Sequence, residues 1–195
     1  MTALNEAALQ QLFFHARTAN KFLDKPVDDA LLVQIHDLMR WAPTSANCNP
    51  LRIVFVRTPQ AKARLLACLP PGNVAKTQSA PVTAILAMDL RFHDQLPKLF
   101  PHADAKAWFE GKEQAIQETA MRNSSLQAAY FMLAARSLGL DCGPMSGFNA
   151  DMVQQSFLAG TTWKVNLLCN LGHGDASALH ARLPRLRFDE ACKLI

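Results

Sequence analysis

Five short polar segments hold most of the residues whose types could do chemistry in this chain of 195 residues. They span residues 17–22, 43–50, 73–76, 143–148 and 184–187. Each segment borders an apolar run, where loops are expected, and loops are where binding residues concentrate. Together the segments offer guanidinium, ammonium, hydroxyl and amide groups, which suit a polar anionic ligand. A phosphorylated cofactor is therefore the predicted ligand.

Three arginines in the first and last of these segments are candidates for binding one phosphate. They are Arg17, Arg185 and Arg187. A guanidinium group supplies paired, geometrically fixed donors that match phosphate oxygens. Taken singly, each arginine is more readily explained as a solvated surface charge. The hypothesis therefore requires that folding bring them together.

The inner segments have a functional and a simpler interpretation. Asn73 and Lys76 are three residues apart, so on a helical turn their amide and ammonium groups could reach one planar ligand. A pair of surface side chains is the alternative. Thr44, Ser45 and Asn47 could likewise serve only as capping and turn residues.

Several other catalytic and cofactor motifs are missing from the sequence. Residues 143–147 lack the Gly-x-Ser-x-Gly spacing of a nucleophile elbow, and no His-Glu-x-x-His or His-x-His pair offers a metal site. The Walker lysine motif is absent. Residues 172–174 read Gly-His-Gly but lack the third glycine of a dinucleotide-binding turn. We predict no metal ion and no Rossmann site.

The composition limits the kinds of binding partner and the cellular compartment that we expect for this protein. The net charge of +4 is spread over scattered lysines and arginines, which argues against a nucleic-acid partner. The five cysteines contain no Cys-x-x-Cys pair, which argues against a disulfide framework and favours the cytoplasm. The longest uncharged span, between Arg122 and Arg136, is too short to cross a bilayer, so no membrane partner is expected. Half of the residues are hydrophobic and no linker divides the chain, so residues 1–195 are expected to form one domain.

Hydrophobic periodicity predicts two helices near these segments. Apolar residues at helical spacing over 31–39 predict an amphipathic helix with a possible cap at Asp28 and an end near Pro43. A long pattern without Pro or Gly predicts a central helix over 113–138, closed by Gly139. The first helix would deliver the segment at 43–50 as a loop.

Three apolar runs predict buried strands. Residues 53–56, 82–87 and 165–171 are rich in β-branched and large apolar side chains, and Gly172 is expected to stop the third strand. A further helix is predicted over 60–69. Strands and helices of this kind indicate a sheet packed against helices.

Residues 91–111 differ in composition from the rest of the chain. They combine Phe92, Phe100, Trp108 and Phe109 with prolines and charges. This composition suits a partly mobile cap that makes apolar contacts, and an ordinary surface excursion is the alternative.

The order and spacing of the five segments resemble the FMN-dependent nitroreductase family. The N-terminal Arg-Ser-x-Arg-x-Phe pattern of that family, which binds the flavin phosphate and pyrimidine edge, reads Arg-Thr-Ala-Asn-Lys-Phe at 17–22. Thr18 keeps the hydroxyl, whereas Asn20 replaces a cation. The terminal Lys/Arg-x-Arg phosphate clamp matches Arg185 and Arg187.

The inner segments match the same family. Its Pro-Ser-Ser-x-Asn-x-Gln-Pro loop, which reaches the isoalloxazine ring from the second subunit, resembles residues 43–50. Its Pro-x-Glu-Gly loop, whose backbone amides approach flavin N5, resembles residues 144–147, where Ser146 replaces the commoner Glu. Its Asn-x-x-Lys pair occurs at 73–76. The resemblance implies the following cofactor-binding residues: Arg17, Thr18, Asn20, Pro43, Thr44, Ser45, Asn47, Asn73, Lys76, Pro144, Met145, Ser146, Gly147, Arg185 and Arg187.

The resemblance also implies a fold, an assembly and a reaction class. The implied fold is α+β and nitroreductase-like, with a mixed, largely antiparallel sheet flanked by helices, in an intertwined homodimer with FMN at the interface. NADH or NADPH would deliver hydride to flavin N5, and a second substrate would then be reduced in the same place by a ping-pong mechanism. No side chain is assigned as a certain catalytic residue. Lys76 is the candidate for stabilising negative charge on the flavin, since Asn20 stands where relatives often have a cation.

Four stretches are similar to one subgroup of the family, which contains the malonic semialdehyde reductase of bacterial pyrimidine utilisation. They are residues 41–48, 122–125, 143–148 and 181–186. This likeness implies reduction of a small aldehyde such as malonic semialdehyde to 3-hydroxypropanoate. Two alternatives stay open: an NAD(P)H nitroreductase or quinone reductase, and a catalytically inactive flavin-binding or flavin-free protein of the same fold.

Overall fold

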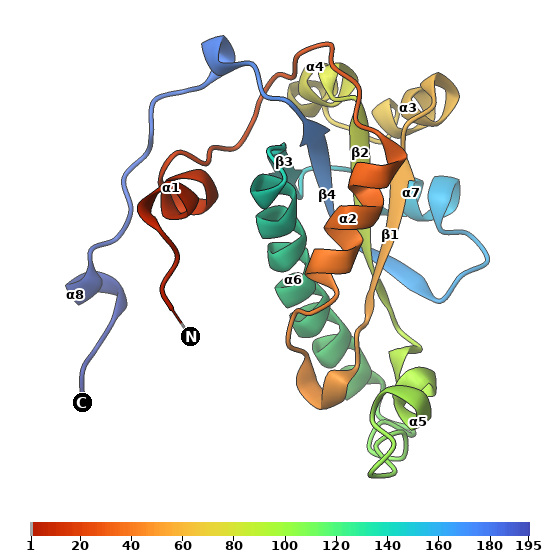
Figure 1. Ribbon diagram of the computed structural model, residues 1–195. Coiled ribbons are helices and arrows are strands. Elements are labelled where there is room, and N and C mark those ends of the chain that lie inside the picture. Colours follow the sequence, from red (N-terminus) through yellow and green to blue (C-terminus); the bar gives the residue numbers. More distant parts are fainter. Residues whose placement is uncertain (1) are drawn as a thin grey trace.

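The computed structural model describes residues 2–195, which fold around a four-stranded sheet with helices on both faces (Figure 1). The strand order is β1 (Leu51–Val56), β2 (Val82–Asp89), β4 (Trp163–Gly172) and β3 (Asp141–Met145). All three neighbouring pairs are antiparallel, which confirms the prediction of a largely antiparallel sheet. Within residues 2–195, parallel pairing is limited to an isolated bridge between Thr18 and Cys142.

Strand β2 is buried along its whole length, because it lies between two strands and beneath helices on both faces. Alternate residues of a strand point to opposite faces of the sheet. Val82, Ala84 and Leu86 therefore join one core cluster, whereas Ile85 and Ala87 join another. Burial on both sides explains why this strand reads as a near-continuous apolar run.

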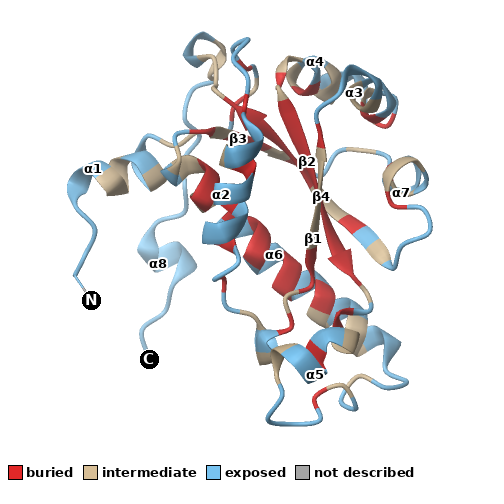
Figure 2. Ribbon diagram, turned by 45° about the vertical axis from the view of Figure 1, so that its right-hand side comes forward, coloured by how far each residue is buried: buried red, intermediate tan, exposed pale blue. Residues whose placement is uncertain are grey.

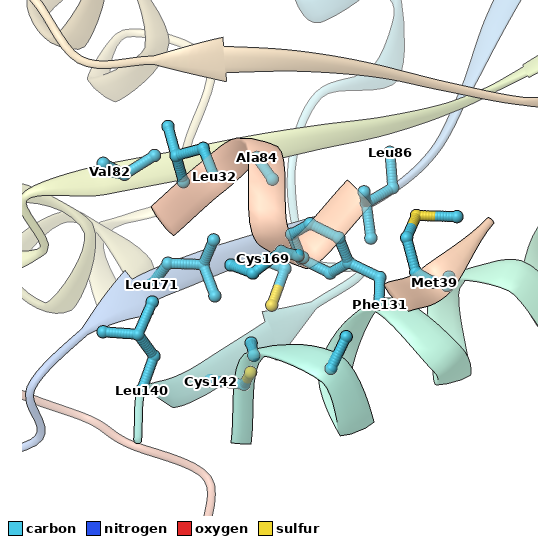
Figure 3. Close-up of a cluster of buried hydrophobic side chains, with 14 of the residues drawn as sticks. Leu32, Met39, Val82, Ala84, Leu86, Phe131, Leu140, Cys142, Cys169 and Leu171 are labelled. Atoms are coloured by element: carbon cyan, nitrogen blue, oxygen red, sulfur yellow. The ribbon is translucent and has the colours of Figure 1, made fainter. Parts of the chain in front are cut away.

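Helices α2 (Asp29–Met39) and α6 (Glu113–Ser137) cover the first face of the sheet. Figure 3 shows the core between them and the strands, to which Leu32, Met39 and Phe131 contribute. Leu32 and Met39 are seven residues apart, or about two helical turns, so they lie on the same face of α2. Full burial of a side chain such as Phe131 contributes roughly 1.5 to 3 kcal/mol.

Helices α3 (Pro59–Leu66) and α7 (Ala150–Phe157) cover the second face. Leu65 of α3, Val153 of α7 and Leu168 of β4 pack together there. Thr58 caps α3 by accepting a hydrogen bond from the amide of Ala61 at 3.2 Å. The helix predicted over 60–69 therefore exists, but it ends three residues earlier.

The two helices predicted on the first face are confirmed with small changes. Gly139 ends α6 in the left-handed conformation, with a φ of +79°, which favours glycine. Asp28 occupies the N-cap position of α2, but its side chain accepts no hydrogen bond there. The capping chemistry predicted for Asp28 is therefore wrong, although its position is right.

The sequence pattern does not predict strand β3, which takes up the first part of the segment at 143–148. Gly143 and Pro144 are typical of loops, but β3 lies at the edge of the sheet, where a missing backbone N–H is tolerated. The expectation that this whole segment is a loop is therefore wrong. Strand β4 ends at Gly172, where the third predicted strand was expected to stop.

Residues 91–111 contain a 3-10 turn at Phe92–Gln95 and the short helix α5 (Leu96–Leu99). Phe92, Leu96 and Ala105 are buried in a third apolar cluster, which also contains Cys48, Met88 and Ala120. The rings of Phe92 and Phe109 meet edge to face with centroids 5.0 Å apart. These contacts confirm the predicted apolar packing of the segment.

The two ends of the chain lie side by side, away from the sheet (Figure 1). The N-terminal end contains α1 (Glu6–Leu9) and a π-helical turn at Gln10–Phe14, and the C-terminal end contains α8 (Phe188–Ala191). Residues 180–195 are exposed throughout (Figure 2). Within residues 2–195, none of the helices is both long and apolar enough to span a bilayer.

Candidate functional site

The N-terminal segment at 17–22 runs along the edge strand β3. Thr18 forms a bridge with Cys142, and the amide of Ala19 donates to the Cys142 carbonyl at 3.0 Å. Gly143 permits this approach, since a Cβ atom on it would lie 2.7 Å from the Ala19 carbonyl oxygen. The segment is thus fixed to the sheet by backbone contacts that do not use its polar side chains.

Beside this segment is a cavity of about 470 Å³ rich in guanidinium groups. Its polar lining consists of Arg17, Thr18, Asn20, Arg136, His180, Arg182 and Arg185. Two of these arginines tie the C-terminal tail to the N-terminal segment. Arg17 Nη2 donates to the His180 carbonyl at 2.5 Å, and Arg182 Nη2 donates to the Phe14 carbonyl at 2.6 Å. Folding therefore brings together four residues predicted from opposite ends of the chain: Arg17, Thr18, Asn20 and Arg185.

Arg136 is a functional candidate that sequence reasoning missed. It lies in the last turn of α6 and lines the same cavity. Its Nε atom is buried and has no hydrogen-bond partner among residues 2–195. A buried donor without an acceptor suits an anion entering the cavity. In the sequence, a basic residue near a helix end signals only a favourable interaction with the helix dipole.

Arg187 is not among the residues that line this cavity. Its guanidinium pairs with Asp189 on the tail, and its side chain is 75% exposed. Arg187 also precedes α8, where its amide donates to Glu190 Oε2 at 2.7 Å. Within one chain, therefore, the two arginines of the predicted terminal clamp are separated.

Helix α4 (Pro71–Ser79) connects the N-terminal segment with the segment at 143–148. Asn73 Nδ2 donates to the Gly147 carbonyl at 2.5 Å. At the other end of α4, Ser79 Oγ accepts a hydrogen bond from the amide of Phe22 at 3.2 Å. Lys76 is half-buried on this helix, one turn beyond Asn73. Pro144 and Met145 lie in β3, and Ser146 and Gly147 follow with exposed positions.

A buried polar network supports the C-terminal end of α4. Lys62 Nζ donates to the carbonyls of Thr77 and Ala80 at 3.1 and 2.8 Å, and to Thr83 Oγ1 at 3.0 Å. Thr83 in turn donates to Asn170 Oδ1, and Asn170 Nδ2 donates to Thr77 Oγ1. Burial lowers the pKa of Lys62 to about 8. These bonds satisfy the last carbonyls of the helix and hold the element that carries Asn73 and Lys76.

The segment at 43–50 lies at the opposite end of the sheet from α4 (Figures 1 and 2). It contains Pro43, Thr44 and a 3-10 turn at Ser45–Asn47, and it leads into β1. Asn47 Nδ2 donates to the Leu99 carbonyl of α5 at 2.9 Å. One chain therefore assembles four of the five segments and leaves this loop apart from them.

The structure combines an α+β fold with a cavity beside an edge strand, and the guanidinium groups that line this cavity suit a small anionic ligand. A family model described as the nitroreductase family matches residues 15–173, and the chain belongs to that family. The predicted family resemblance is confirmed.

Relatives are similar along their whole length. A protein of Polynucleobacter asymbioticus, provisionally named NADH dehydrogenase/NAD(P)H nitroreductase, is 59% identical over 194 residues, which cover 100% of this chain and 99% of the relative. A protein of Stenotrophomonas maltophilia with the same provisional name is 57% identical, with 98% of each chain covered.

Solved structures share the fold. A provisionally named nitroreductase of Bacillus subtilis superimposes with a TM-score of 0.90 at 23% identity, covering 98% of this chain and 100% of the other. Another, from Exiguobacterium sibiricum, was solved in complex with FMN and gives a TM-score of 0.85 at 18% identity, covering 100% of this chain and 99% of the other. At these identities the likeness confirms the predicted nitroreductase-like fold.

Proposed function

We propose that this protein is an FMN-dependent NAD(P)H oxidoreductase. The observation that carries the proposal is the convergence of Arg17, Thr18, Asn20 and Arg185 around one cavity, beside the buried unpaired Nε of Arg136. A terminal phosphate fits this donor set, because guanidinium groups bind phosphate oxygens in pairs. Family membership, the names of the relatives and the FMN complex of the Exiguobacterium protein support the same cofactor.

Each part of the site has a task in this proposal. Arg17, Arg136 and Arg185 hold the phosphate, and Thr18 adds a hydroxyl. Asn73 fixes the backbone at Gly147 through the bond at 2.5 Å, so that the amides of Ser146 and Gly147 keep a set direction. When bound, FMN accepts hydride from NADH or NADPH and passes it to a second substrate. Lys76 supplies positive charge where the ring becomes more negative.

We propose that two copies complete the site as an intertwined homodimer. The loop containing Pro43, Thr44, Ser45 and Asn47 lies far from the cavity of its own chain and would serve the neighbouring copy. Large apolar side chains remain exposed on three connected elements, which is typical of a surface covered by a partner. They include Phe13 and Phe14 near α1, Met121, Leu126 and Tyr130 on α6, and Leu183, Leu186 and Phe188 on the tail.

Two acceptor classes follow from the family and the subgroup likeness. The first is a small aldehyde such as malonic semialdehyde, which would yield 3-hydroxypropanoate. The second is a nitroaromatic or a quinone, and the word nitroreductase in the names of the relatives favours the nitroaromatic. Either reaction consumes NADH or NADPH, so we place the protein in the cytoplasm, where these donors are abundant.

The absorbance spectrum of the purified protein tests the cofactor, and steady-state kinetics then tests the acceptor. We expect a yellow protein that releases FMN on denaturation and oxidises NADH or NADPH when an acceptor is present. Matched assays with malonic semialdehyde, a nitroaromatic and a quinone rank the acceptors by kcat/KM. Bound FMN without turnover of any acceptor would indicate a flavin-binding protein that lacks activity, and a colourless protein unable to take up FMN would refute the proposal.

Replacing Lys76 with Met should lower the midpoint potential of bound FMN by a few tens of millivolts. The charge-assisted hydrogen bond that is lost stabilises the reduced ring by about 1 to 3 kcal/mol, and roughly 30 mV corresponds to 1.4 kcal/mol for a two-electron couple. Anaerobic redox titration measures the shift. Arg185→Ala is the control, since it should weaken FMN binding while leaving the potential of bound FMN unchanged. A Lys76 variant with the wild-type potential would show that Lys76 is a surface charge.

A further inference from the structure

The loop at 44–49 has an unusual backbone. Three of its residues adopt positive φ without being glycine: Ala46 at 48°, Asn47 at 49° and Asn49 at 41°. Asparagine enters this left-handed region fairly readily, but alanine does so at a cost, because its Cβ approaches the following carbonyl. Such a conformation persists only where the surroundings hold it in place.

Two buried amide side chains of α6 hold this loop at both ends. Asn123 Oδ1 accepts a hydrogen bond from the amide of Ser45 at 2.8 Å. Gln127 Oε1 accepts one from the amide of Leu51 at 2.9 Å, and its Nε2 donates to Asn49 Oδ1 at 3.1 Å. Asn123 and Gln127 are four residues apart, so they lie on the same face of α6. They are only 2% and 3% exposed.

The buried side-chain amides of Asn123 and Gln127 have hydrogen-bond partners, and most of these partners belong to the loop or its ends. Asn123 uses its remaining donor on the Thr119 carbonyl at 2.8 Å, so both ends of its amide are paired. Inside the loop, Asn49 Nδ2 donates to the Asn47 carbonyl at 2.7 Å. Cys48 is buried and anchors the middle of the loop in the apolar cluster of residues 91–111. Ser45 and Asn47 are left exposed.

We propose that Asn123 and Gln127 are positioning residues that hold the loop at 44–49 in its strained shape, so that Thr44, Ser45 and Asn47 are presented to the FMN site of the second copy. The proposal rests on the proposed function, because that function supplies the flavin and the dimer. The last turn of α6 carries Arg136 at the phosphate cavity. Helix α6 therefore holds the loop that would serve the partner, and it also forms one wall of the phosphate cavity in its own chain.

The test compares variants that cut these hydrogen bonds with a matched control. Asn123→Ala and Gln127→Met remove the bonds, whereas Asn123→Asp keeps the acceptor for the Ser45 amide. Asn166→Ala is the control, because Asn166 Nδ2 also bonds to α6, through Ser124 and Ser125 Oγ at 3.0 Å each, but its amide does not contact the loop. FMN affinity is measured by equilibrium titration, the ring environment by visible circular dichroism, and the protection of the Ser45 and Leu51 amides by hydrogen exchange.

We expect Asn123→Ala and Gln127→Met each to weaken FMN binding about tenfold or more and to lose protection of the loop amides, with Asn123→Asp and Asn166→Ala within about threefold of wild type. Adding Ala46→Gly to Asn123→Ala should restore part of the affinity, because glycine adopts positive φ without strain.

Equal losses in the Asn166 control, or no rescue by Ala46→Gly, would overturn the positioning role. Wild-type loop amides that exchange as fast as those of the variants would overturn it as well, whether or not FMN binds. A wild-type protein that binds no FMN would instead overturn the proposed function, and with it the presentation of the loop to a flavin.

Discussion

Arg17→Ala should weaken FMN binding roughly 10- to 150-fold and leave the affinity for riboflavin nearly unchanged. Hydrogen bonds to charged groups contribute about 1.5 to 3 kcal/mol, and each 1.4 kcal/mol is a tenfold change in affinity. Riboflavin lacks the phosphate, so it does not use this guanidinium. Fluorescence titration of the flavin-free protein with both ligands measures the difference.

Arg40→Ala is the control for this substitution. Arg40 is exposed after the end of α2 and belongs to none of the five segments, so its removal changes the net charge by the same amount without touching the cavity. Arg17 also bonds to the His180 carbonyl and thereby helps to hold the tail that carries Arg185. If riboflavin and FMN lost affinity equally, Arg17 would act through the position of the tail and not through the phosphate.

Gly143→Ala should destabilise the protein by about 1 to 3 kcal/mol and abolish tight FMN binding. The added Cβ would lie 2.7 Å from the Ala19 carbonyl oxygen, which belongs to the backbone and cannot rotate away. Overpacking of this kind forces the backbone to shift. The segment that moves carries Arg17, Thr18 and Asn20, so the phosphate cavity should be lost together with the stability. Urea unfolding and FMN titration measure the two effects.

Gly72→Ala provides the matched comparison. Gly72 lies in the first turn of α4, and a Cβ atom there would meet no atom within 4 Å. Alanine stabilises a helix by up to about 1 kcal/mol relative to glycine, so this variant should be slightly more stable than the wild type and should bind FMN normally. Wild-type stability in the Gly143 variant would mean that the N-terminal segment does not lie against β3.

The amino-acid pattern predicted the elements whose buried residues form a continuous apolar run or a regular helical repeat. β2 and α6 were predictable because apolar runs and periodicity record burial directly. β3 was not, because Gly143 and Pro144 mark loops locally, and only the position of the strand at the edge of the sheet makes them acceptable.

The residues of the candidate site divide in the same way. The sequence by itself determined the family, through five ordered segments that include Arg17, Asn73 and Arg185, because ligand-binding groups must keep their chemical type. Only the tertiary structure added Arg136, Lys62, Asn123 and Gln127, which read in the sequence as ordinary polar residues of helices. Their importance comes from their neighbours in space. Arg136 lines the cavity, Lys62 bonds to the last carbonyls of α4, and Asn123 and Gln127 bond to the backbone at the two ends of the strained loop at 44–49. A hydrogen bond depends on distance and direction in space, so a partner many residues away leaves no periodic signal along the chain.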